Sequence, residues 1–462
     1  MLRYLLLLLF LVPVQSSAFV SGQNATLVIG HPDFDDGGTI HDNASASVLY
    51  SPDGIAFDKL DDLWVADTGF NRVLEFVPPF TNGDGAALVI GQDNFTSTNA
   101  TLSATGLDQP YGMAFDNNGN LWVADTNNNR IVEYKEPFTT GEAASLVIGS
   151  PSFDKGVYPT TAGSLAAPYG IAFDRSGDLW VVDYYDNRVL EFVPPFENRM
   201  NASLVLGQYD FTSNSDGITQ NSMNLPSAIA FDPGGNIWVT DSLNNRALKF
   251  VPPFSTGESA SLVIGQENFT TNFAGITNIS LNTPYGIIFD RSANLWITDG
   301  NNARVLGYAP PFVNGMVASI VLGQVNFAEM HTGTSSSTLS EPYDVKVDNT
   351  GNLWIADTDN NRILEFAAST FNVQIPQWVK NNAKWWSEGK VDDQSFLGGM
   401  QYMIKNGIMT IPSTFSNASG TPTQQIPSWI RSSAGWWANG QISDNDFVKG
   451  IEYLISNNII RI

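Results

Sequence analysis

Residues 110–149, PYGMAFDNNGNLWVADTNNNRIVEYKEPFTTGEAASLVIG, contain four runs of strand-forming residues, at 112–116, 120–125, 130–134 and 144–149. Gly, Asn and Pro residues between the runs are typical of turns. The tryptophan of this stretch, Trp122, recurs at a constant spacing of 58 residues. Its counterparts are Trp64, Trp180, Trp238, Trp296 and Trp354. A fixed period of this length indicates a repeat architecture, so the stretch is one of six copies of a unit.

Six copies of a four-stranded unit predict a β-propeller. The sixth copy stops after its third strand, at Phe366, whereas residues 25–30, ATLVIG, match the missing fourth strand. We therefore expect the N-terminal strand to complete the last blade, because this closes the ring and leaves no unpaired edge between the first and last blades. The expected fold is all-β over residues 19–372, a six-bladed β-propeller with four-stranded blades, followed by two small helical modules.

An aspartate ends the second strand of every copy, and an arginine follows it five residues later. The pairs are Asp67 and Arg72, Asp125 and Arg130, Asp183 and Arg188, Asp241 and Arg246, Asp299 and Arg304, and Asp357 and Arg362. In isolation, an Asp, two Asn and an Arg would suit a metal or a phosphate. Because the set occurs six times, we interpret it as a structural pair within or between blades.

The shared pattern, PYGIAFDxxGNLWVADTxNNRVLEF, resembles the NHL repeat over roughly the first four-fifths of the chain. The resemblance implies the same six-bladed propeller. It says almost nothing about activity, because one scaffold hosts unrelated functions. Within this fold, the loop between the second and third strands shares a face with the long connection to the next blade. We expect function on this loop-rich face.

The N-terminal residues 1–18 have the features of a secretory signal peptide, with Arg3, an apolar run at 5–12 and a small-residue cleavage site at Ser16-Ser17-Ala18. No later stretch is long enough for a membrane helix, so we expect none in the mature chain. The chain has no cysteine, which excludes a thiol nucleophile. Eight Asn-x-Ser/Thr sequons suit an exported glycoprotein, although an Asn- and Thr-rich chain also produces them by chance. The expected location is secreted or at the cell surface.

The charge is strongly negative, with 22 Lys and Arg against 46 Asp and Glu and a net charge of −24. Such a surface repels phosphate backbones, so binding of nucleic acid is not expected. This also disfavours the RNA binding that is known for some intracellular proteins with NHL repeats.

A unique site should lie where the six copies differ, and the positions after the opening prolines should border the central channel. Five residues there or in the neighbouring loops could gather beside the seam of the ring: His41, Asp53, His331, Glu341 and Asp344. Imidazole and carboxylate groups would suit a metal ion, which is the one cofactor that the sequence suggests. Some NHL-type lyases and related propeller hydrolases hold a metal at this place, but no set of three histidines lies on successive blades here. The alternative is that the histidines are exposed to solvent and bind no metal.

Aromatic residues are candidates for the binding face. Tyr111, Tyr169, Tyr285 and Tyr343 follow the opening prolines, where they would stack on a ligand or wedge the blades together. Phe70, Tyr184 and Tyr185 interrupt a loop that is otherwise made of Asn and Asp, which suggests an exposed recognition surface.

The C-terminal region contains a second repeat. Residues 375–412 and 426–462 share the pattern IPxW…WW and flank a linker at 413–425. Each copy predicts two short helices, and the pattern resembles a tandem module of exported proteins of ammonia-oxidising archaea. In each of the tandem pairs, Trp385-Trp386 and Trp436-Trp437, one indole should be core and the other exposed. The two copies would pack on each other or attach to the cell envelope.

Taken together, the sequence favours a non-enzymatic binding protein whose propeller faces a protein or glycan partner, with the C-terminal modules for envelope attachment or oligomerisation. A metal-dependent lyase or hydrolase with its site at the channel mouth is the alternative.

Overall fold

The computed structural model describes residues 19–35, 43–156, 159–368, 377–405 and 428–439. Residues Phe19–Ala368 form one compact unit, and the C-terminal helices belong to a second unit, which is described separately below. The expected signal peptide, His41 and the linker at 413–425 lie outside the described residues.

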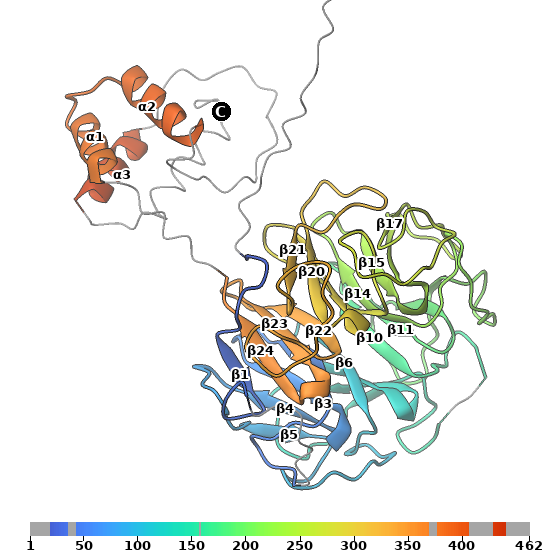
Figure 1. Ribbon diagram of the computed structural model, residues 1–462. Helices are drawn as coiled ribbons and strands as arrows, with labels where there is room; N and C mark the ends of the chain where they lie inside the picture. Colours follow the sequence, from blue (N-terminus) through green and yellow to red (C-terminus); the bar gives the residue numbers. More distant parts are fainter. Residues whose placement is uncertain (1–18, 36–42, 157–158, 369–376, 406–427, 440–462) are drawn as a thin grey trace, which may run out of the picture. The chain divides into compact units, whose positions relative to one another are not determined.

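The first unit consists of six four-stranded antiparallel sheets, so the predicted six-bladed propeller is confirmed (Figure 1). Blade 1 contains β2 (Pro52–Phe57), β3 (Leu63–Asp67), β4 (Arg72–Phe76) and β5 (Leu88–Ile90). Blade 2 contains β6 (Pro110–Phe115), β7 (Leu121–Asp125), β8 (Arg130–Tyr134) and β9 (Leu146–Ile148). Blade 3 contains β10 (Pro168–Phe173), β11 (Leu179–Asp183), β12 (Arg188–Phe192) and β13 (Leu204–Leu206).

Blade 4 contains β14 (Pro226–Phe231), β15 (Ile237–Asp241), β16 (Arg246–Phe250) and β17 (Leu262–Ile264). Blade 5 contains β18 (Pro284–Phe289), β19 (Leu295–Asp299), β20 (Arg304–Tyr308) and β21 (Ile320–Leu322). Blade 6 contains β22 (Pro342–Val347), β23 (Leu353–Asp357), β24 (Arg362–Phe366) and β1 (Leu27–Ile29). Short 3-10 turns follow the second strands of five blades, at η1 (Thr68–Phe70), η2 (Thr126–Asn128), η3 (Ser242–Asn244), η4 (Gly300–Asn302) and η5 (Thr358–Asn360).

The N-terminal strand closes the ring, as the sequence predicted. In Figure 1 the blue β1 lies beside the orange β24, and the two strands pair antiparallel with Leu27 opposite Glu365 and Ile29 opposite Ile363. Phe19 adds a second contact, because its ring packs edge-to-face on Trp296 of blade 5 at 5.0 Å. The N-terminal segment thus supplies both the fourth strand and an aromatic contact to the last two blades.

The side chains of the repeated tryptophans pack between neighbouring blades. Trp64 is fully buried and packs edge-to-face on Phe115 and Phe138 of the next blade. Trp354 makes the same contact across the seam with Phe57 and Phe80 of blade 1, at 5.6 and 5.1 Å. Because each of these side chains joins two sheets, the hydrophobic core consists of clusters that each lie between two neighbouring blades.

The repeated Asp and Arg residues form buried ion pairs within each blade. Arg130 donates from Nε to Oδ2 of Asp125 at 2.6 Å, and both side chains are fully buried. The guanidinium of Arg130 also donates to the carbonyl oxygens of Phe153, Ser103 and Gly106 in the long blade connections. The same pair occurs in all six blades. Each arginine therefore ties the loop-rich face to its own sheet.

The C-terminal unit contains three described helices, α1 (Gln377–Ser387), α2 (Asp393–Lys405) and α3 (Ser428–Ala438). Helix α1 of the first copy packs against α3 of the second, and the contact is reciprocal. The guanidinium of Arg431 lies 4.9 Å above the ring of Trp386, and Nζ of Lys380 lies 5.5 Å above that of Trp437. The two copies therefore pack on each other, with cation–π contacts in both directions.

Each tandem tryptophan pair divides between core and surface. Trp386 and Trp437 are fully buried, whereas Trp385 and Trp436 are 47% and 52% exposed. The ring of Trp386 stacks on Phe396 of α2 at 3.9 Å, and its Nε1 donates to Asp393 at 2.8 Å. Of the helices that the structure describes, none has the length and apolarity that a bilayer crossing requires.

Candidate functional site at the channel mouth

The six innermost strands begin on the loop-rich face, and the residue before each opening proline has a left-handed backbone. These residues are Ser51, Gln109, Ala167, Leu225, Thr283 and Glu341, with φ between 46° and 53°. Non-glycine residues rarely adopt this conformation, so neighbouring groups must hold it. Oδ1 of Asn129 accepts a hydrogen bond from the amide of Ala167 at 2.7 Å. The repeated asparagines thus position the start of the next inner strand.

Glu341 departs from this arrangement. In the other five cases, the amide of the residue before the proline donates to the side chain of an asparagine that directly precedes the repeated arginine of the neighbouring blade. For Glu341 the equivalent position, before Arg304, is Ala303, which has no side-chain acceptor. The segment that leads into blade 6 therefore lacks the side-chain acceptor that the others have.

An irregularity in strand register follows each proline and turns the next side chain toward the axis. The register between β10 and β11 shifts between Pro168 and Ile171, and the other five blades shift at the same place. Bulges of this kind commonly re-aim a side chain. Glycine then permits the blades to approach, because a Cβ on Gly112 would lie 2.2 Å from the carbonyl oxygen of Tyr169.

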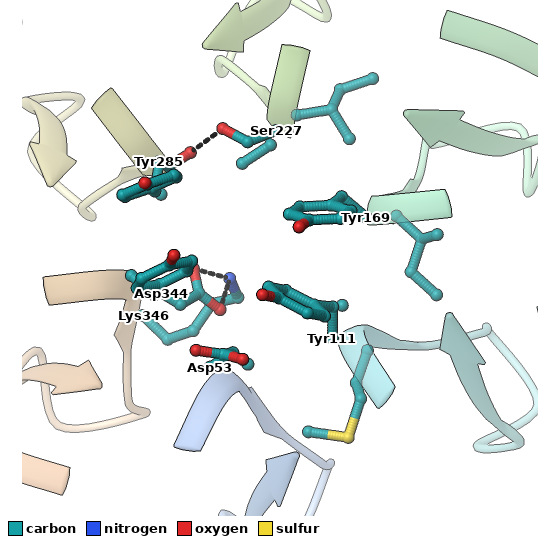
Figure 2. Close-up of a pocket in the computed structure, with 16 residues that line it drawn as sticks. Asp53, Tyr111, Tyr169, Ser227, Tyr285, Asp344 and Lys346 are labelled. Carbon is teal, nitrogen blue, oxygen red and sulfur yellow. Dashed lines mark hydrogen bonds and ion pairs between the residues drawn. The ribbon is translucent and has the colours of Figure 1, made fainter. Parts of the chain in front are cut away.

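The residues after the prolines line a pocket around the axis (Figure 2). In ring order they are Asp53, Tyr111, Tyr169, Ser227, Tyr285 and Tyr343. Asp53 and Ser227 lie opposite each other, and the four tyrosines form two stacks. The stacks meet on the Asp53 side, where the rings of Tyr111 and Tyr343 are 6.0 Å apart. Tyr285 and Tyr343 stack at 4.0 Å, and Tyr111 and Tyr169 stack at 4.1 Å. The space open to the centre of a water molecule is about 50 Å³, room for a few waters or one small chemical group.

Asp53 is the most unusual group in the pocket. Its side chain is 5% exposed, and its Oδ1 has no hydrogen-bond partner among the described residues. Burial raises the pKa of Asp53 to about 8, and the hydroxyls of Thr68, Thr358 and Tyr111 only partly offset this effect. The carboxyl group therefore changes charge near neutral pH, which is a common property of functional sites.

The tyrosines remain neutral at physiological pH. Burial raises the pKa values of Tyr111, Tyr169 and Tyr343 far above the ordinary value, and it raises that of Tyr285 to about 12. Each hydroxyl can therefore donate or accept a hydrogen bond.

A charge pair that occurs only in blade 6 completes the lining. Nζ of Lys346 donates to both carboxylate oxygens of Asp344 at 2.7 and 2.6 Å (Figure 2). Oδ2 of Asp344 also accepts a hydrogen bond from the amide of Ile55 in blade 1 at 3.1 Å. Most of the other blades have Gly and Ala at these two positions. Sequence reasoning missed Lys346, although this double departure from the repeat was a usable signal.

The four metal candidates that the structure describes do not converge. Asp53 and Asp344 line the pocket, and the half-buried Glu341 accepts a hydrogen bond of 3.4 Å from the hydroxyl of Tyr285. His331 does not reach the pocket: its side chain is exposed on the connection to blade 6, where its backbone bonds to Gln324. Among the described residues, the one set of three acidic or histidine ligands within reach of a common ion is Asp58, Asp62 and Glu75. These residues belong to the opposite end of blade 1.

The interpretation of Phe70 as an exposed aromatic was wrong. Phe70 is buried, packs against Tyr50 at 5.4 Å and lies beside the guanidinium of Arg72 at 5.0 Å. Its polar counterpart in blade 2, Asn128, is buried as well and donates to Asp125, so this loop position faces inward regardless of its polarity.

The other two candidates of that loop divide between pocket and surface. Tyr184 stacks on Tyr169 at 4.1 Å and extends one of the two tyrosine stacks, whereas Tyr185 is 63% exposed. Sequence reasoning missed two further exposed aromatics, Tyr209 and Phe273, which lie in long blade connections.

The model of the NHL repeat matches residues 107–134 and 339–366. The chain contains NHL repeats. The two matched segments lie in blades 2 and 6 and end with β8 and β24, so the family model recognises the first three strands of a blade.

Curated relatives include the peptidyl-glycine alpha-amidating monooxygenases A and B of Xenopus laevis. They are 22% identical over 284 residues and 24% identical over 287 residues, each covering 59% of this chain. This chain matches only about a quarter of their length, 26% and 28%.

Among solved structures, similar folds include a virginiamycin B lyase from Staphylococcus aureus with quinupristin (15% identity, 72% of this chain and 88% of that one, TM-score 0.40). A gluconolactonase from Xanthomonas campestris is 14% identical over 74% of this chain and 98% of its own, with a TM-score of 0.43. These likenesses concern the fold alone.

Proposed function

We propose that this protein is a binding protein whose propeller presents its loop-rich face to a protein or glycan partner. One observation carries the proposal: the three exposed aromatic side chains of the described propeller, Tyr185, Tyr209 and Phe273, are all on this face. Tyr209 and Phe273 are 76% and 77% exposed. Exposed rings on a rigid scaffold are efficient anchors, because they bury a large area and lose little conformational entropy on binding.

The rigid base of this face supports the same interpretation. The buried arginines hold the long connections through carbonyl contacts, and glutamines add further anchors. Nε2 of Gln266, for example, donates to the carbonyl of Phe273 at 2.9 Å, which fixes the backbone beneath that exposed ring. Preorganised contact residues strengthen binding, because less freedom is lost in the complex.

A metal-dependent lyase or hydrolase is the second candidate, and Asp53 is the observation that favours it. A buried carboxyl group with a pKa of about 8 is suited to general acid or base catalysis. Metal analysis of the purified protein tests this candidate. Stoichiometric metal that is lost in an Asp53→Asn or Asp344→Asn variant would favour the enzyme over the binding protein.

The location and the role of the C-terminal modules belong to the same proposal. The sequence of residues 1–18 supports export, and the exposed Trp385 and Trp436 offer apolar contacts for envelope attachment or oligomerisation. Cell fractionation with an antibody against the propeller tests the location.

A binding screen tests the main function. The full-length protein is applied to glycan and surface-protein arrays beside a Tyr209→Ala/Phe273→Ala variant. A Leu60→Ala/Val251→Ala variant is the matched control, because it removes exposed apolar side chains from the opposite face. We expect the aromatic variant to lose at least tenfold in affinity and the control to bind like the wild type. Equal loss in both variants would contradict a role for the loop-rich face.

A further inference from the structure

We propose that the pocket at the channel mouth binds a primary ammonium group, carried either by a small amine or by a lysine side chain. This inference rests on the proposed binding function and names the chemistry at the centre of the binding face. It follows from three features of the pocket: a buried carboxyl group with one unsatisfied oxygen, a surrounding ring of hydroxyls, and a small volume.

The first feature is the unsatisfied carboxyl group of Asp53. Oδ1 is buried, aimed into the pocket and without a hydrogen-bond partner, and no described Lys, Arg or His forms an ion pair with this side chain (Figure 2). Lys346, the cation of the pocket lining, is held by Asp344. The nearby hydroxyls of Thr68, Thr358 and Tyr111 offset the burial of this carboxyl only in part. An ammonium group would supply a donor to Oδ1 and the compensating charge for the ionised carboxylate.

The second feature is the chemistry around Asp53. Tyr111 and Tyr343 come from the two neighbouring blades and line the pocket beside Asp53. Neutral hydroxyl oxygens accept hydrogen bonds from an ammonium group, and aromatic rings attract cations. Asp344 already neutralises Lys346, so the ionised carboxylate of Asp53 would be the uncompensated charge of the pocket lining and would attract a cation.

The third feature is the size of the pocket. About 50 Å³ of space open to the centre of a water molecule admits an ammonium head together with its remaining waters. A metal ion fits less well than an ammonium group, because the described part of the channel mouth contains no set of three metal-ligating side chains within reach of one ion. One carboxylate surrounded by hydroxyls and rings suits an N–H donor with three hydrogens.

Saturation-transfer NMR titrations of the full-length protein test the inference with three probes. These are n-butylamine, the neutral n-butanol and the bulky n-butyltrimethylammonium. We expect the amine to bind at least tenfold more tightly than the other two, and Asp53→Asn to weaken the amine at least tenfold. Glu75→Gln is the matched control, because it removes an acidic group from the cluster of Asp58, Asp62 and Glu75 and should leave amine binding unchanged.

Two further measurements use the wild-type protein, so they do not depend on whether the Asp53→Asn variant folds. In the wild type, amine affinity should rise from pH 6 to 8.5 as Asp53 ionises beside Tyr111, Tyr169, Tyr343 and Glu341. The lysine source is tested with Nα-acetyl-lysine methylamide and its Nζ-acetylated form, of which only the first should bind.

The possible failures are distinguishable. Equal binding of amine and alcohol, or binding of Ca²⁺ or Zn²⁺ in place of the amine, would overturn the ammonium site. Loss of that site with retained array binding through Tyr209 and Phe273 would leave the proposed function intact. Amine binding by a protein that finds no partner on the arrays would support the ammonium site and contradict the proposed function.

Discussion

The hydroxyl of Thr358 donates a hydrogen bond of 2.7 Å to the carbonyl oxygen of Pro52, which precedes it by 306 residues. The equivalent bond from Thr126 to Pro168, also 2.7 Å, joins blades 2 and 3, which follow each other in the chain. The same bond therefore holds the seam and an ordinary junction between blades.

This equivalence predicts the effect of removing the hydroxyl. Thr358→Val and Thr126→Val should each lower the free energy of unfolding by about 1–3 kcal/mol, because a buried carbonyl loses its donor. Urea denaturation followed by tryptophan fluorescence measures both variants. A substantially larger loss at only one of the two positions would mean that the seam and the ordinary junction are not equivalent.

Removing one partner of a buried ion pair should be more damaging. Arg130→Met leaves Asp125 buried without its cation and removes three carbonyl contacts, so we expect a loss of about 3–5 kcal/mol in the free energy of unfolding. Lys135→Met removes an exposed cation of the same blade and should change stability by less than about 0.5 kcal/mol. Similar denaturation midpoints for the two variants would contradict a structural role for the repeated arginine.

Asp53 predicts a dependence of stability on pH. Its pKa is about 8 in the folded protein and near 3.8 in the unfolded chain, so the folded state retains a proton that the unfolded chain loses. The contribution of Asp53 to stability is therefore complete below pH 4 and declines as pH rises toward 8, by up to about 1.4 kcal/mol per pH unit.

The measurement compares melting temperatures of the wild type and Asp53→Asn between pH 5 and 9. Other titrating groups cancel in this comparison, apart from the directly coupled Glu341. The wild type should lose stability relative to the Asn variant as pH rises. A constant difference would indicate that Asp53 titrates at its ordinary pKa.

The tandem tryptophans of the C-terminal unit offer an internally controlled test. Trp386→Ala removes a buried ring that contacts Phe396, Asp393 and Arg431, and should destabilise this unit by about 3–5 kcal/mol. Trp385→Ala removes its exposed neighbour and should have little effect. Near-ultraviolet circular dichroism during thermal unfolding follows both variants. Equal destabilisation would contradict the division between core and surface.

The sequence predicted the blades and the seam because both depend on a pattern that recurs at a fixed spacing. Because a tryptophan occupies the same position in all six copies, one structural role must explain all of them, and this leaves few alternatives for the fold. The N-terminal strand was found by the same reasoning, since residues 25–30 match a unit that is missing at residue 366.

The unique contacts were harder to predict, because they depend on which residues of different blades meet at the axis. The arrangement of two tyrosine stacks with Asp53 and Ser227 on opposite sides of the pocket appears only when the ring is closed. Phe70 misled because its counterparts are polar, yet that position is buried through hydrogen bonds in one blade and through ring packing in another. At this loop position, the polarity of a residue does not predict whether its side chain is buried.

The pairing of β1 with β24 also has a consequence for synthesis on the ribosome. β1 is the first strand of the propeller to be made, but its partner is complete only at Phe366. For more than three hundred residues the nascent chain therefore carries a strand with no partner, and an unpaired strand is a template for association with other chains. Protection of this segment by a chaperone, or late docking of the N-terminus, is thus a requirement that the closure imposes on biogenesis.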